Sequence, residues 1–167
     1  MYSLMADTQH CDLKRQLLAQ SPHAKFIESD WTDWLTPHVT AHLLSHGRFL
    51  PVSTPVREEL GVLLRCHFTV LDRWRERIGS QAYFGFGLYP YKGRSYWWLH
   101  SWLIDAEGVL IDSAHGQDKD TRYYGAPWSK ALLAAVIMSP DHPFDEILLD
   151  GLKSTAPTKA VPSQSTR

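Results

Sequence analysis

The first half of the chain carries hydrophobic residues at three- and four-residue spacing, which is the period of an amphipathic helix. This spacing predicts helices over residues 13–19 and 31–46. The Ser-Pro pair at residues 21–22 separates them, and Gly47 is placed to end the second. The N-terminal quarter is therefore expected to be helical.

Two prolines among β-branched residues predict extended backbone over residues 49–55. A third helix is then expected to begin near Pro55 and to run over residues 56–78. One stripe of this helix would be largely apolar, and it consists of Leu60, Leu63, Leu64, His67, Leu71, Trp74 and Ile78.

The pattern changes from helical to extended in the middle of the chain. Residues 82–88 and 95–104 are dense in aromatic side chains, which predicts two paired strands. Residues 105–108 supply a turn, after which residues 109–112 run back antiparallel. Side chains alternate along a strand, so one face of residues 95–104 should present Trp98, His100 and Trp102, and the other Trp97, Leu99, Ser101 and Leu103.

The C-terminal part combines weaker signals. Residues 127–138 are apolar and alanine-rich, and Pro127 suits a first helical turn, while residues 146–150 have the character of a short strand. The polar, proline-containing residues 154–167 are expected to form a disordered tail. The whole pattern predicts one α+β domain over residues 1–153, with a helical part (1–48) followed by a core (49–153) that holds a central helix and a small antiparallel sheet.

Composition narrows the class of protein. The chain has 167 residues, 44% of them hydrophobic, which is enough for one core, and its net charge of −1 argues against a nucleic-acid partner. It has neither a signal-peptide pattern nor an apolar run of membrane-spanning length, so we expect a cytoplasmic protein without a membrane partner. The two cysteines, Cys11 and Cys66, lack the CxxC spacing of a zinc knuckle and are treated as individual thiols.

The predicted hairpin brings a histidine and a carboxylate together. If Ile104 pairs with Val109, Asp112 lies opposite Ser101, or opposite His100 if a one-residue bulge intervenes. A carboxylate beside an imidazole fixes its orientation and stabilises its charged form, and a nucleophile completes such a set.

Cys66 is the candidate nucleophile. A helix that began at Cys66 would favour its thiolate, whereas the longer helix over residues 56–78 would place the thiol mid-helix. A lone cysteine is also often just a small buried hydrophobe.

The order of these residues resembles that of the papain-like cysteine hydrolase superfamily in its compact bacterial and phage forms, related to NlpC/P60 and transglutaminase-like domains. Residues 50–128 carry the resemblance, through Cys66-His67, His100-Ser101-Trp102, Gly108-Val109-Leu110-Ile111-Asp112 and Tyr123-Tyr124-Gly125.

The resemblance implies a papain-like fold with Cys66 as nucleophile, His100 as general base and Asp112 as orienting acid. It implies hydrolysis or acyl transfer at an amide, isopeptide or thioester bond of a peptide or protein, without metal or cofactor. Candidate substrate-contacting residues are Trp98, Trp102, His115 and Tyr124.

Two other interpretations remain open. His38, His42 and His46 would form one row on a helix and could chelate zinc or nickel, although the absence of an HExxH glutamate favours a solvated or half-buried face. The chain could also be a non-catalytic inhibitor or adaptor that binds a partner through its aromatic sheet, with Cys66 buried and inert. His67, on the apolar stripe and adjacent to Cys66, is expected to be a core histidine or one that supports the site without touching substrate, and not the base.

Overall fold

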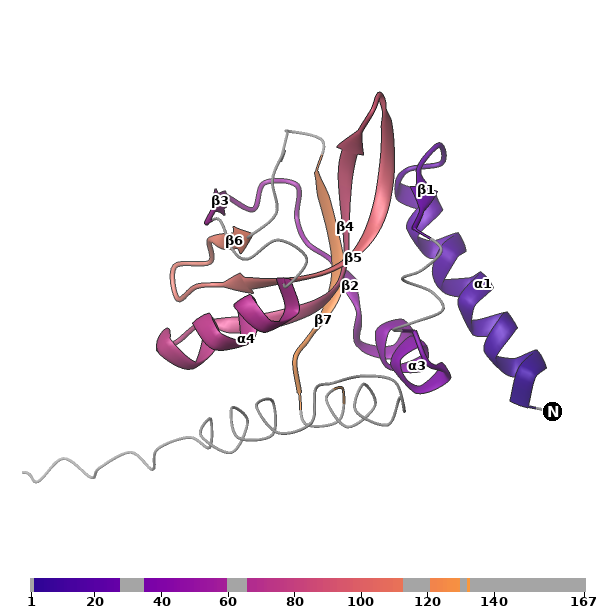
Figure 1. Ribbon diagram of the computed structural model, residues 1–167, viewed down its shortest axis with the longest axis horizontal. Coiled ribbons are helices and arrows are strands. Elements are labelled where there is room, and N and C mark those ends of the chain that lie inside the picture. Colours follow the sequence, from indigo (N-terminus) through magenta and orange to yellow (C-terminus); the bar gives the residue numbers. More distant parts are fainter. Residues whose placement is uncertain (1, 28–34, 60–65, 113–120, 130–131, 133–167) are drawn as a thin grey trace, which may run out of the picture.

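The computed structural model describes residues 2–27, 35–59, 66–112, 121–129 and 132 (Figure 1). The described helices are α1 (Tyr2–Gln20), α3 (Pro37–His46) and α4 (Cys66–Glu76). The strands are β1 (Lys25–Phe26), β2 (Arg48–Phe49), β3 (Val56–Glu58), β4 (Gln81–Tyr91), β5 (Arg94–Ile104), β6 (Leu110–Asp112) and β7 (Arg122–Pro127). The predicted α+β class is confirmed. Among the described helices, none is long and apolar enough to cross a membrane.

The sheet is mixed, where an antiparallel sheet was predicted. Its strand order is β2-β7-β4-β5-β6-β3, and β1 also pairs with β5. The pairs β1–β5 and β3–β6 are parallel, while the pairs β7–β4, β4–β5 and β5–β6 in the centre of the sheet are antiparallel. The β4–β5 hairpin turns at Lys92 and Gly93, whose φ angles of 49° and 73° are those of a tight two-residue turn.

The described helices pack on one face of the sheet. That face contributes Phe84 and Trp97 to a core that also contains Leu13 of α1, Leu43 of α3 and Val70 of α4. The other face carries a separate aromatic cluster made of Tyr83, Tyr89, Trp102, Leu110 and Tyr123. The predicted alternation along β5 is thus confirmed.

Two glycines let aromatic rings lie flat on this second face, which we call the site face. A Cβ atom at Gly87 would lie 2.3 Å from Cε2 of Tyr89, and one at Gly125 would lie 2.7 Å from Cη2 of Trp102. Any other residue at these positions would therefore displace the rings that surround His100.

The predicted helix over residues 56–78 is wrong at both ends. Val56–Glu58 forms β3, because its residues pair in parallel with Leu110–Asp112 of β6, and this long-range pairing overrides the local helical pattern. Helix α4 ends at Glu76, and Ile78, which was expected on the buried stripe, is fully exposed. Residues 60–65 lie outside the described part.

Other element boundaries agree in part with the sequence pattern. α3 begins at Pro37 behind the N-cap Thr36, and the N–H of Gly47 donates to the Leu43 carbonyl at 2.8 Å, so Gly47 ends the helix as predicted. Pro127 belongs to β7, opposite Tyr83, and is not the first turn of a helix. The predicted strand at residues 146–150 and the tail at 154–167 lie outside the described residues.

Candidate functional site

The hairpin of β5 and β6 joins His100 to Asp112. Nε2 of His100 lies 2.6 Å from Oδ1 of Asp112, and both side chains are buried. The prediction that the hairpin brings this carboxylate beside this imidazole is confirmed. Because Nε2 is occupied by Asp112, Nδ1 is the ring nitrogen left to face another group.

The hairpin register differs by one residue from the one predicted. Leu103 pairs with Ile111 and Ile104 with Leu110, so continuing the ladder sets Asp112 opposite Trp102, on the face of β5 that carries His100. The reason lies in the turn, where the N–H of Asp105 donates to the Val109 carbonyl at 3.0 Å. The Asp105 carboxylate also accepts from the N–H of Val109, and Gly108 has a φ of 80°. Residues 105–109 separate the paired residues Ile104 and Leu110, one residue more than the four expected.

Two tyrosines complete the surroundings of Asp112. The hydroxyls of Tyr89, on β4, and Tyr123, on β7, each donate to Oδ2 of Asp112 at 2.5 Å. Burial alone would raise the pKa of Asp112, but the charge of His100 and the hydrogen bonds from His100, Tyr123 and Tyr89 lower it to about 2. Asp112 is therefore a buried carboxylate with donors on both of its oxygens.

Both tyrosines are held as neutral donors. Burial, together with the negative charge of Asp112, raises the pKa of Tyr89 well above its usual value. The same causes, in the same order, raise the pKa of Tyr123. Neither hydroxyl loses its proton at physiological pH, so both remain available to the carboxylate.

Helix α4 brings Cys66 to His100. On the side of β5 away from β4, β1 pairs with Tyr96 and Trp97, and β6 pairs with Leu103 and Ile104. On that side, no described strand pairs with β5 between Trp97 and Leu103. His100 lies in this unpaired stretch. α4 packs against β5, and its first described residue, Cys66, is partly exposed and hydrogen-bonded to His100.

The electrostatics of Cys66 favour the thiolate. Burial would raise the pKa of the thiol, but the positive charges of His67 and His100, and hydrogen bonds to both, lower it to about 4. Burial would lower the pKa of His100, but the charges of Asp112 and Cys66 raise it well above its usual value. At neutral pH the pair is thus a thiolate beside an imidazolium.

His67 is buried, as predicted, but it also belongs to the site. Its Nδ1 lies 2.7 Å from Oγ of Ser101, and Nε1 of Trp128 donates to the same hydroxyl at 3.3 Å. Its contact with Cys66 agrees with the expectation of a histidine that lies in the core or supports the neighbouring site residue. β5 therefore presents His100 on the site face and, one residue later, the serine that anchors the second histidine.

The remaining predicted site residues fall in different places. Trp98 is 36% exposed and shares the site face with His100. Trp102 is fully buried and stacked on Tyr83, so it supports the site from inside and offers no open surface. Tyr124 is fully buried on the helix-covered face, where its hydroxyl donates to the Leu43 carbonyl at 2.8 Å, so it does not join His100. His115 lies outside the described residues.

A cluster of ion pairs connects β6, the strand that ends at Asp112, to helix α4. The N–H of Glu59 donates to the Asp112 carbonyl at 2.7 Å, while Arg73 donates to the Glu59 carbonyl at 2.8 Å. Arg77 donates two hydrogen bonds, of 3.2 and 2.5 Å, to the Glu59 carboxylate. This contact is the main cause that lowers the pKa of Glu59. The cluster links β3 and β6 to the helix that begins with Cys66.

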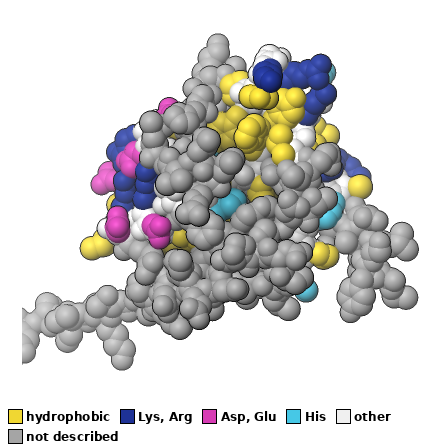
Figure 2. Space-filling view, viewed as in Figure 1, with side chains coloured by type: hydrophobic (Ala, Val, Ile, Leu, Met, Phe, Trp, Pro, Cys, Tyr) yellow, Lys and Arg dark blue, Asp and Glu magenta, His cyan; other side chains and the backbone are white. Residues whose placement is uncertain are grey.

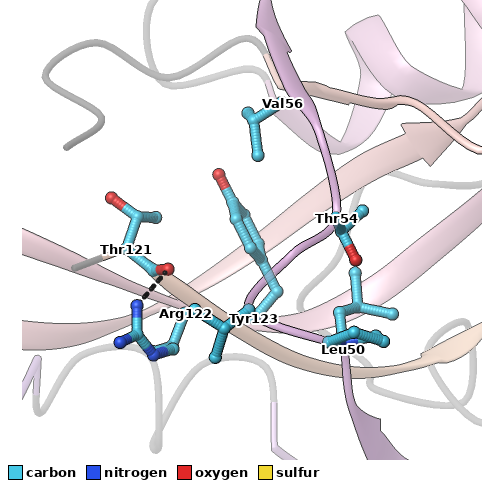
Figure 3. A pocket seen from close by; sticks show the side chains of 8 residues that line it. Leu50, Thr54, Val56, Thr121, Arg122 and Tyr123 are labelled. Atoms are coloured by element: carbon cyan, nitrogen blue, oxygen red, sulfur yellow. Dashed lines mark hydrogen bonds between the residues drawn. The ribbon is translucent and has the colours of Figure 1, made fainter. Parts of the chain in front are cut away.

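A small pocket adjoins the tyrosine side of the site (Figure 3). Figure 3 shows the ring of Tyr123 standing in it with the hydroxyl end toward Val56. That hydroxyl is bonded to Asp112, so the pocket shares one lining residue with the surroundings of the carboxylate. Its lining residues are Leu50, Pro51, Val52, Thr54, Val56, Thr121, Arg122 and Tyr123.

The histidine row on α3 does not assemble a metal site among the described residues. His42 and His46 stack with ring centroids 4.4 Å apart, and burial together with the charge of His46 lowers the pKa of His42. No group of three potential metal ligands comes together anywhere in the described ranges.

Comparison of the chain with protein-family models, with curated proteins and with solved structures gives no match in any of the three.

Proposed function

We propose that this chain is a cysteine-dependent hydrolase or acyltransferase that acts on an amide, isopeptide or thioester bond of a peptide or protein. The observation that carries the proposal is the chain of contacts from the Cys66 thiol to His100 and from His100 to Asp112. A partly exposed thiol with a pKa of about 4 is unlike the buried, inert cysteine that a non-catalytic binding module would have.

The reaction follows from the charges of the three groups. The Cys66 thiolate attacks the substrate carbonyl carbon and forms a C–S bond, and the imidazolium of His100 gives its proton to the departing amine or thiolate. His100, now neutral, takes a proton from water or an acceptor amine, which attacks the thioester and releases Cys66 as thiolate. Asp112 remains ionised throughout and holds the ring of His100 in place.

A papain-like fold is part of the proposal. It is supported by the order of Cys66, His100 and Asp112 along the chain and by the packing of α4 against β4 and β5. In such an arrangement, backbone N–H groups near Cys66 are expected to stabilise the oxyanion of the tetrahedral intermediate.

Trapping of the acyl-enzyme tests the proposal. Incubation with a short peptide thioester is expected to add one acyl group to Cys66, detectable by intact mass and peptide mapping. Cys66→Ala should give no adduct, while Cys11→Ser, which changes the exposed second cysteine, should react like the wild type. The proposal fails if no adduct forms on the wild type, or if it forms on Cys11 alone.

A further inference from the structure

The β4–β5 hairpin exposes two aromatic side chains next to two cations. Tyr91 is 49% exposed and Trp98 36% exposed, and their rings meet edge to face with centroids 6.2 Å apart. Lys92 and Arg94 are exposed at the tip between them, with Nζ of Lys92 5.1 Å from the centroid of Tyr91. We call these four residues the hairpin surface. In Figure 2, hydrophobic and basic side chains lie together at the top, where Figure 1 places the hairpin tip.

The hairpin surface leads to the proposed nucleophile. Trp98 and His100 lie two residues apart on one face of β5, about 7 Å along a strand. Arg94 is six residues from His100, which is about 20 Å. An extended peptide that follows β5 from the tip would therefore bring a bond some six residues further along to the contact between His100 and Cys66.

Within the described part of the chain, no acidic group pairs with the charge of this surface. No carboxylate occurs in the sequences of β4, β5 or β7, and no ion pair joins Lys92 or Arg94 to any described residue. The described carboxylates gather elsewhere, notably around Glu59 and Asp105, where each already has a basic partner. A ligand on the hairpin surface thus meets positive charge and aromatic rings together.

We propose that the hairpin surface binds an acidic segment of a peptide or protein substrate. An apolar side chain of that segment packs on Trp98 and Tyr91, and carboxylates about five to seven residues from the reacting carbonyl pair with Lys92 and Arg94. That the bound segment belongs to a substrate rests on the proposed function. The surface itself can be tested without any turnover.

The test uses two fluorescein-labelled, acetylated peptides that share one phenylalanine and differ only in carrying several glutamates or the same number of glutamines. Binding to the Cys66→Ala protein is followed by fluorescence anisotropy at about 0.05 M and about 0.5 M salt. The glutamate peptide is expected to bind roughly fivefold more tightly at low salt, and this preference should shrink at high salt.

Two variants locate the effect. The double variant Lys92→Gln/Arg94→Gln should lose the preference for the glutamate peptide, while Trp98→Ala should weaken both peptides to a similar degree. Lys14→Gln/Arg15→Gln removes the same charge from α1 and should keep the preference, because α1 packs on the other face of the sheet. Far-UV circular dichroism checks that each variant is folded.

Failure of this inference differs from failure of the proposed function. Equal affinity for the two peptides, or a full preference retained in Lys92→Gln/Arg94→Gln, overturns the acidic-ligand proposal even if the acyl-enzyme forms. A clear preference at the hairpin surface without any acyl-enzyme on the wild type would uphold the surface and overturn the hydrolase.

Discussion

The two faces of the sheet show how one strand serves two purposes. On the helix-covered face, β5 contributes Trp97 and Leu99 to an apolar core with α1 and α3. On the site face, the same strand contributes His100 to a buried network of charge-assisted hydrogen bonds with Asp112. Apolar packing stabilises roughly in proportion to area, whereas a buried polar network stabilises only if each member keeps its partners. We therefore expect stability to depend mainly on the first face and reactivity on the second.

The largest effect is expected from Asp112→Asn. The amide can still accept from the tyrosines, but it removes the negative charge that holds His100 as an imidazolium in the right orientation. Acylation by a peptide thioester should fall by about 10³- to 10⁴-fold. A rate within about tenfold of the wild type would show that Asp112 does not position His100 for chemistry.

Leu43→Ala tests the opposite face. Leu43 is fully buried in the helix-covered core, and its truncation should lower the free energy of unfolding by about 3 kcal/mol in a denaturant titration. The labelling rate of Cys66 at neutral pH should stay at the wild-type value, because Leu43 packs in the core on the face of the sheet opposite to His100 and Asp112. A large loss of thiol reactivity in the folded variant would mean that the two faces are not separate.

Removal of the tyrosine hydroxyls tests how much the hydrogen bonds to Asp112 on the site face contribute to stability. Since the pKa of Asp112 is about 2 in the folded state and near 4 unfolded, its ionisation contributes about 2–3 kcal/mol to stability above pH 4, and this is lost as the pH falls toward 2. Tyr89→Phe and Tyr123→Phe should each raise that pKa and lower stability at pH 7 by about 1 kcal/mol.

The measurement is the free energy of unfolding as a function of pH. The acid-induced loss begins near the unfolded pKa in both proteins, but in Tyr89→Phe/Tyr123→Phe it should be smaller and should level off at higher pH than in the wild type, because the folded pKa of Asp112 is raised. Leu43→Ala serves as the control, because it should lower the whole curve without changing the size of the loss or the pH at which it levels off. Parallel curves for the wild type and the double tyrosine variant would refute the role given to the hydroxyls.

The smallest effect is expected from Glu59→Gln. The ion-pair cluster is partly exposed, so the loss of charge should lower the free energy of unfolding by only about 1 kcal/mol, and by less at high salt. The Glu59 N–H contact with the Asp112 carbonyl is retained, so acylation should change less than twofold to threefold. A salt-independent loss above about 3 kcal/mol would show that the cluster behaves as a buried network.

Local patterns predicted the parts of the fold that local interactions determine. The aromatic alternation of β5 and the turn after it are contained within about twenty residues, so the contact between His100 and Asp112 followed from sequence. β3 did not, because Val56–Glu58 is extended only through its partner β6, more than fifty residues away. The one-residue error in the hairpin arose in the turn, where the Asp105 carboxylate accepts from the N–H of Val109 and holds residues 105–109 as the loop.

The tyrosines illustrate a second limit. Tyr123 and Tyr124 are adjacent, and only the register of β7 against β4 decides which of them reaches the site face. The motif resemblance pointed to Tyr124, whereas Tyr123 contacts Asp112. Tyr89 lies two strands from Asp112 in the sheet, so no sequence pattern indicated their contact.

The pH dependence of Cys66 alkylation tests the central claim most directly. With Cys11 changed to serine, the iodoacetamide labelling rate should stay nearly constant from pH 8 to about pH 5, because the thiol is already ionised. His100→Ala and His67→Ala should each move the drop in rate to higher pH, and the double variant should move it furthest, because both histidines lower the pKa of Cys66. A wild-type rate that falls about tenfold per pH unit below pH 8, as for an ordinary thiol, would contradict the account.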